Sequence, residues 1–174
     1  MNNIEKLVEI LSKNNRTFFR FTDKRNLPSI REHGLLSMEI LRERNIIRVA
    51  GGNDWSLDAD RRSGMDAFVH LCFFDEHPME YLATREGRID ESKFLRISPE
   101  VLLSEGVKIC DRVANRSDAL PKPAAEMVDL LDLQVIYTRT DWKDPGIQAR
   151  LKAAKRCEIL IPKVIPIKLI MGLD

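Results

Sequence analysis

The feature that most constrains this chain is a short segment near its C-terminus in which a carboxylate begins an apolar run. Residues 158–162 read Glu-Ile-Leu-Ile-Pro and directly follow Lys155, Arg156 and Cys157. Such a run is typical of a buried strand. Because an unpaired buried carboxylate costs several kcal/mol, Glu158 is solvated at the strand end, paired with Lys155 or Arg156, or kept for chemistry. Its position alone favours the ion pair.

The composition is that of an ordinary globular protein without a general attraction for polyanions. The chain has 174 residues, of which 44% are hydrophobic and 32% are charged, and this suits one compact domain with a substantial core. Its net charge is only +1. A nucleic-acid partner would therefore have to be held by a local basic face.

Signals for metal binding, membrane insertion and secretion are missing from the sequence. Cys72, Cys110 and Cys157 are scattered, with no CxxC spacing and no His/Cys cluster that could hold zinc. No apolar run approaches the ~20 residues that a bilayer span needs. The N-terminus lacks the basic and apolar regions of a signal peptide. We therefore expect a cytoplasmic protein with no metal and no membrane partner.

Short strands interleaved with helices predict an α+β fold with mixed or antiparallel sheets and flanking helices. The expected helical segments are residues 3–13, a short helix that Asn26 caps and His33-Gly34 closes, and residues 99–103, 123–132 and 147–155. The expected strands are residues 17–22, 68–74, 93–97, 107–110, 159–161 and 167–171, with 68–74 apolar enough to be central. Residues 38–66 are expected to form a long, polar, mobile insertion. No repeat or domain boundary is apparent, so residues 1–174 are expected to form a single domain.

Three collinear blocks carry a resemblance to a known family. Residues 19–36 look like a first strand and an NAD-contacting turn. Residues 60–81 contain paired arginines ahead of a strand and a Pro-Met-x-Tyr turn, and residues 141–162 contain a tryptophan and a Lys-x-x-Glu-apolar strand. In this order and with similar gaps, the blocks resemble the DarT family, the bacterial toxin-type ADP-ribosyltransferases that modify bases of single-stranded DNA. No single block is specific, whereas the collinear set covers most of the chain.

The resemblance implies a set of functional residues. Glu158 matches the catalytic glutamate of the family, and Arg62 is favoured over Arg61 as the catalytic arginine. The residues implied to contact NAD are Arg20, Thr22, Asn26, Leu27, Gly34, Leu36 and Tyr81. The residues expected to contact nucleic acid are Arg61, Arg112, Arg150, Lys152 and Lys155.

The chemistry of the family requires residues of these types. Breaking the nicotinamide–ribose bond of NAD places positive charge on the ribose, and a carboxylate that holds a ribose hydroxyl, such as Glu158, stabilises that charge. The pyrophosphate requires cations and oriented N–H donors, which an arginine on the first strand and a helix start can supply. NAD is therefore the expected co-substrate.

Two positions depart from the family pattern. Arg20 stands where the family usually has a histidine, and it is similar to the arginine of the Arg-Ser-Glu type of ADP-ribosyltransferase. Val113 stands where the family tends to have a histidine near the acceptor. The second departure puts thymidine in question as the best acceptor, while the NAD half of the reaction is unaffected.

Each candidate residue also has a purely structural interpretation. Arg20 could lie over the sheet edge or pair with Asp23. The paired arginines and the basic stretch 150–156 have the ordinary interpretation of solvated charges. Tyr81 and Trp142 fit core anchors as well as stacking platforms. The three histidines are interpreted as a helix end, a core strand residue and a turn residue, at His33, His70 and His77.

The sequence thus predicts an NAD-dependent mono-ADP-ribosyltransferase of the toxin or phage-defence type that modifies a base of single-stranded nucleic acid. The resemblance favours DNA and implies a cognate antitoxin as a partner, and we expect the chain to be a monomer. One alternative is the same enzyme class with an RNA or protein acceptor, which Val113 and the near-neutral charge support. A second is a non-catalytic nucleic-acid-binding module of the same fold, against which the presence of Glu158, Arg62 and Thr22 argues.

Overall fold

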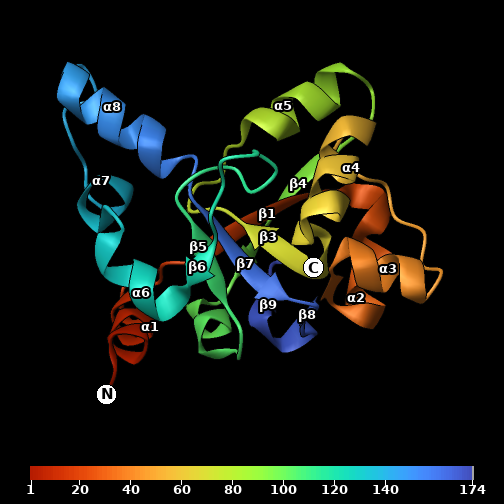
Figure 1. The fold of residues 1–174 in the computed structure, drawn as a ribbon, viewed down its shortest axis with the longest axis horizontal. Helices are drawn as coiled ribbons and strands as arrows, with labels where there is room; N and C mark the ends of the chain where they lie inside the picture. Colours follow the sequence, from red (N-terminus) through yellow and green to blue (C-terminus); the bar gives the residue numbers. More distant parts are fainter. Residues whose placement is uncertain (174) are drawn as a thin grey trace.

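The fold is built from three antiparallel sheets with helices at both edges, and the computed structural model describes residues 1–173 (Figure 1). The largest sheet has the order β3-β7-β5-β6, formed by Phe68–Leu71, Glu158–Pro162, Lys108–Cys110 and Lys122–Pro123. A second sheet has the order β1-β4-β9, formed by Phe18–Asp23, Ser92–Ile97 and Ile170–Met171. The third pairs β2, Leu35–Leu36, with β8, Val164–Ile165. The predicted α+β class with antiparallel sheets is confirmed.

The helices gather in two groups on opposite sides of the sheets in Figure 1. One group, near the loop that precedes β3, consists of α2 (Leu27–His33), α3 (Met38–Glu43) and α4 (Asp54–Ser63). The other contains α1 (Asn3–Lys13), α6 (Ala124–Met127), α7 (Leu133–Tyr137) and α8 (Pro145–Ala154), while α5 (Pro78–Arg85) follows β3. Short 3-10 helices complete the described elements at Lys24–Asn26, Met65–Ala67, Pro99–Leu103, Val128–Leu130 and Ile167–Leu169.

Strand β7 lies in the middle of the core. Ile159, Leu160 and Ile161 are at most 1% exposed, and β3 and β5 pair with the strand on its two sides. An isolated bridge between Phe19 and Cys72 joins the end of β3 to β1. The two larger sheets thus meet where β7 begins, which is where Glu158 is placed.

Several predicted elements are confirmed, two strands are corrected, and one polar segment contains helices that were not predicted. Helix 3–13 and the strands near 17–22, 93–97 and 107–110 form as expected, as does the short helix from Asn26 to Gly34. Residues 38–66, predicted as a long, polar, mobile insertion, contain α3 and α4, and their mobility stays a prediction. The side chains of Ser37 and Asn53 cap these two helices, so local capping overrides the polar composition.

The other two corrections concern strands. Strand β3 ends at Leu71 and lies at the edge of its sheet rather than at the centre, because its backbone pairs with β7 alone among the strands of that sheet. Residues 167–171 form a 3-10 turn, Ile167–Leu169, followed by the two-residue strand β9. Among residues 1–173, no helix is long and apolar enough to cross a bilayer.

Candidate active site

A cavity lies where the two larger sheets meet. Its wall is formed by residues of β1, the start of α2, the segment 48–52 ahead of α4, and β3, together with Glu158 from β7. The charged and titratable side chains in this wall are Arg20, Arg48, Asp60, Asp66, His70, His77, Cys72 and Glu158. The cavity therefore concentrates charge in a wall that also contains apolar side chains and the polar side chains of Thr22, Asn26, Ser37 and Asn115.

Glu158 is only 7% exposed, and its carboxylate has two partners, one backbone N–H and one histidine ring. The backbone N–H of Ala114 donates to Oε2 at 2.9 Å, and Nδ1 of His70 lies 3.4 Å from the same oxygen. Burial alone would raise the pKa of Glu158, but the hydrogen bond and the charge of His70, with the Ala114 N–H, outweigh it and hold the pKa below its usual value. The expected ion pair with Lys155 or Arg156 is wrong, since Lys155 pairs with Glu76.

Two arginines approach the cavity from different elements. Arg20 projects from β1, and its Nη1 donates to the carbonyl oxygen of His70 at 3.4 Å. Arg48, in the segment ahead of α4, is anchored by donating to Ser29 Oγ at 3.0 Å and to the Gly34 carbonyl at 2.9 Å. Burial lowers the pKa of Arg20, and burial with the charge of Arg20 lowers the pKa of Arg48 to about 10. Because the charge of Arg20 disfavours the charge of Arg48 in the same cavity, an anion between the two guanidinium groups would stabilise both charges.

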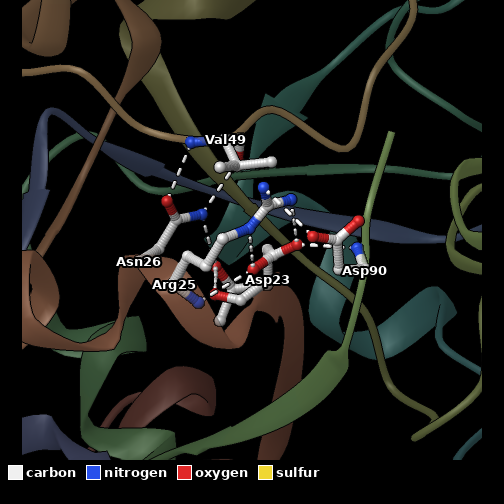
Figure 2. A network of polar contacts seen from close by, with 6 residues as sticks. Asp23, Arg25, Asn26, Val49 and Asp90 are labelled. Carbon is white, nitrogen blue, oxygen red and sulfur yellow. Dashed lines mark hydrogen bonds and ion pairs between the residues drawn. The ribbon is translucent and has the colours of Figure 1, made fainter. Parts of the chain in front are cut away.

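Arg20 does not pair with Asp23, contrary to one interpretation of the sequence. Figure 2 shows that Asp23 instead belongs to a network at the end of β1. Arg25 donates to Asp23 from its backbone N–H, Nε and Nη2 at 2.8–2.9 Å, and the Asp90 N–H donates at 2.9 Å. The hydrogen bonds from Arg25 hold the pKa of Asp23 well below its usual range. This network fixes the strand end and leaves Arg20 directed to the cavity.

The same turn also holds the segment that carries Arg48. Asn26 donates from Nδ2 to the Val49 carbonyl at 2.8 Å and accepts from the Val49 N–H at 2.8 Å (Figure 2). Its Nδ2 also donates to Thr22 Oγ1 at 3.1 Å. This paired amide contact resembles a sheet ladder, so Asn26 ties residues 48–50 to β1 and thereby positions Arg48.

Asp60, on α4, faces the cavity with an unsatisfied oxygen. Its Oδ1 is buried and has no hydrogen-bond partner among residues 1–173, and burial raises the pKa of Asp60. Since an unsatisfied buried oxygen is costly, this atom is available to an N–H or O–H donor of a ligand.

A second cavity adjoins the first and has a different character. The two share His77, Met79 and Val113, and the second is otherwise lined by the exposed face of α8 and by Trp142. Its basic residues are Lys152, Lys155 and Arg156. Trp142 is 66% exposed, so the core-anchor interpretation is wrong for it, and the cavity has the aromatic and basic character of a single-stranded nucleic-acid groove.

Comparison with known families decides the identity. Residues 19–174 match the family described as ssDNA thymidine ADP-ribosyltransferase, DarT. The chain belongs to the DarT family. The predicted family is thereby confirmed, and the description of that family names an ADP-ribosyltransferase.

Solved structures share the DarT fold at low sequence identity. Thermosipho africanus DarTG, bound to ADP-ribose, is 20% identical with a TM-score of 0.67, and the match covers 89% of this chain and 42% of that one. Thermus sp. 2.9 DarT is 21% identical. Its complex with ADP-ribosylated ssDNA matches with a TM-score of 0.63 over 89% of this chain and 78% of that one. Its complex with NAD+ matches with a TM-score of 0.56 over 89% of this chain and 79% of that one. The chain thus spans less than half of the DarTG chain. A search of curated protein sequences finds no match.

The residues that the DarT resemblance implied for NAD fall into two groups. Arg20, Thr22, Asn26 and Leu36 line the first cavity. Leu27 is buried outside its lining. Tyr81 is 63% exposed on α5, outside this lining and not a core anchor. Gly34 ends α2 at φ 77°, and a Cβ there would collide with the carbonyl oxygen of Ile165, so only glycine fits the turn.

The paired arginines of the DarT pattern lie elsewhere. Arg61 and Arg62 are exposed in the last turn of α4, where Arg62 Nε donates to the carbonyl of Asp58 at 3.3 Å. Neither lines the first cavity. The assignment of Arg62 as catalytic stays a prediction, and Arg48 occupies the cavity wall instead.

The residues expected to contact nucleic acid also divide. Lys152 and Lys155 line the second cavity. Arg150 instead makes a bidentate pair with Asp132 at 2.6 and 2.7 Å, which holds α8 against the start of α7. Arg112 pairs with Asp111 at 3.0 Å and with Asp118 at 2.7 Å. Their role in nucleic-acid contact stays a prediction.

Sequence reasoning missed Arg48, Asp60 and the pairing of His70. His70 was interpreted as a core strand residue, but it lines the cavity and contacts Glu158. Arg48 lies in the apolar run 46–50 within a polar region, a contrast that could have indicated a wall segment. Asp60 precedes the paired arginines and carried no signal of its own.

Proposed function

We propose that this chain transfers the ADP-ribose of NAD to a base of single-stranded DNA, within one domain that contains both cavities. The observation that carries the proposal is the buried Glu158 in the wall of a cavity that also holds Arg20 and Arg48. DarT proteins from Thermus that share the fold hold NAD+ and ADP-ribosylated ssDNA, which supports both halves of the reaction.

The side chains in the first cavity fit NAD. The pyrophosphate carries negative charge, for which the guanidinium groups of Arg20 and Arg48 are suitable partners. The hydroxyl and amide donors of NAD suit carboxylate acceptors, and the unsatisfied Oδ1 of Asp60 is one such acceptor. Among residues 1–173, no group of three or more His, Cys, Asp and Glu side chains is arranged to hold a metal ion.

The residues act through charge and position. NAD supplies a glycosidic bond whose cleavage releases nicotinamide with the bonding electron pair and leaves positive charge on the ribose. Glu158, ionised and buried, lowers the energy of that charge, because a fixed carboxylate in a water-poor site needs little reorganisation. The acceptor nitrogen then forms the new bond to the ribose carbon, and its proton passes to solvent. Val113 and His77, shared by both cavities, lie where the acceptor base must enter.

The second cavity suits the acceptor strand. Exposed Trp142 offers a ring on which an unpaired base can stack, and Lys152 and Lys155 offer charge to the phosphates. A double-stranded substrate would require the target base to leave its stack, which favours single strands.

Incubation with radiolabelled NAD and separate pools of single-stranded DNA, RNA and protein tests the proposed function. We expect label in the DNA pool from the unmodified chain. Glu158→Gln should lower labelling at least about 100-fold, because the amide keeps the shape of the side chain but loses its charge. Its melting temperature should stay within a few degrees, since the amide oxygen can accept from Ala114.

Three outcomes would contradict this account. Label in RNA or protein instead of DNA would move the chain to the alternative acceptor class. Retained turnover in Glu158→Gln would remove Glu158 from catalysis. A loss of stability of about 3–5 kcal/mol without loss of turnover per folded molecule would make Glu158 a structural ion-pair partner.

The two candidate arginines can be compared directly. Arg48→Gln should raise the KM for NAD about tenfold, because Arg48 lines the cavity, whereas Arg62→Gln should change it less than about twofold. Steady-state kinetics with a fixed DNA oligonucleotide measures both variants. If Arg62→Gln abolishes transfer while Arg48→Gln is neutral, Arg62 is the catalytic arginine, as the family pattern implies.

The acceptor base is tested through Val113. Because Val113 stands where the family has a histidine, we expect a base other than thymidine to be labelled faster in oligonucleotides that differ at one position. Val113→His should raise labelling of thymidine by restoring a group that can hydrogen-bond the base. Robust thymidine labelling by the unmodified chain, unchanged by Val113→His, would show that this position does not set the acceptor.

A further inference from the structure

The side chain of His70 lies between two acceptors. Its Nε2 is 2.8 Å from the carbonyl oxygen of Met65, and its Nδ1 is 3.4 Å from Oε2 of Glu158. A neutral imidazole has one N–H and one lone pair, so it could satisfy only one of them and would turn its lone pair towards the other. Only the imidazolium donates to both. A protonated Glu158 would be an alternative donor, but its Oε2 also accepts from the Ala114 N–H, which favours the carboxylate.

The sheet register brings the two side chains together. His70 pairs with Leu160 across β3 and β7, and Glu158 lies two residues before Leu160. Residues two apart on a strand point to the same face, so His70 and Glu158 are diagonal neighbours on the face towards the cavity. The pair is therefore specified by strand pairing and not by a flexible loop.

We propose that His70 is a positioning residue: as an imidazolium it holds Glu158 ionised and turned so that one carboxylate oxygen faces the ligand. This inference rests on the proposed function, since it assigns a partner to the same catalytic carboxylate. Both donors, His70 and Ala114, use Oε2, and Oε1 accepts no hydrogen bond from residues 1–173. Oε1 is thus the oxygen left for a ribose hydroxyl.

The charged groups around His70 decide its proton. Glu158 on β7 and Asp60 on α4 favour the imidazolium. Arg20 on β1 and His77 before α5 line the same cavity, and a positive charge on either disfavours a second positive charge on His70. Two further neighbours contribute little, since Asp66 pairs with Arg42 and burial raises the pKa of the Cys72 thiol to about 12. Burial lowers the pKa of His70, but Glu158, Asp60 and the Met65 carbonyl outweigh it, so the pKa lies above the ordinary value of 6.5. His70 is therefore fully protonated, and holds Glu158 in place, below pH 6.5. This positioning is lost as the pH rises through the raised pKa of His70.

The first test needs no activity. Nitrogen-15 spectra of the imidazole rings, recorded on the folded chain without NAD, should show one histidine with both ring nitrogens protonated at neutral pH. That signal should be absent from His70→Gln, and Glu158→Gln should lower its pKa. An uncharged His70 ring at a pH below 7 would overturn the proposal, whether or not the chain has transfer activity.

The second test uses the pH dependence of transfer. His70→Gln should lower kcat about tenfold or more with less than about threefold change in the KM for NAD. The reason is that this substitution removes the group that orients the carboxylate but leaves the rest of the NAD site intact. The rate of the unmodified chain should fall on the alkaline side, and this fall should be absent in His70→Gln. His33→Gln, outside both cavities, is the matched control and should leave the profile unchanged.

An identical alkaline fall in the unmodified chain and in His70→Gln would overturn the positioning role. If the unmodified chain transfers nothing to any acceptor, the proposed function fails, while the spectra still decide the state of His70. The two failures are therefore distinguishable.

Discussion

The burial of one carboxylate at the start of the central strand is the constraint on which the rest of the site depends. Glu158 is 7% exposed, and within residues 1–173 only the Ala114 N–H and the ring of His70 compensate for its lost hydration. Satisfying it requires β3 in register with β7 and requires the chain after β5 to fold back over the strand start. A structural role alone would be met as well by an apolar residue, so the cost of burial points to chemistry.

A second constraint is the like charge of two arginines, Arg20 and Arg48, that line the same cavity. Burial lowers the pKa of both guanidinium groups, and the charge of Arg20 lowers the pKa of Arg48 further. Each side chain therefore requires a rigid support. The network of Figure 2 supplies that support, because Asp23 fixes the end of β1 and Asn26 ties Val49 to it. Anions bound between the two guanidinium groups would relieve their repulsion, which couples ligand binding to the order of the segment ahead of α4.

The sequence predicted what local patterns determine and missed what tertiary placement determines. Helix 3–13 follows from its apolar period and its caps, and the strand after Glu158 follows from a run of β-branched and apolar residues. Glu158 itself is conspicuous in the sequence because it is a charged residue at the start of that apolar run. His70 was misinterpreted because its partners lie on Met65 and on β7, and no spacing in the sequence brings them together. Arg48 was hidden in a region whose polar composition concealed two capped helices.

The proposed chemistry requires that Glu158 faces the nicotinamide ribose in the cavity that Arg20 and Arg48 flank. A crystal structure with a non-hydrolysable NAD analogue tests it most directly; carba-NAD+ has been bound to Thermus DarT. The account predicts a ribose hydroxyl within about 3 Å of Oε1 of Glu158 and the pyrophosphate against the two guanidinium groups. An analogue bound in another cavity, or in this one with its ribose turned away from Glu158, would contradict the claim.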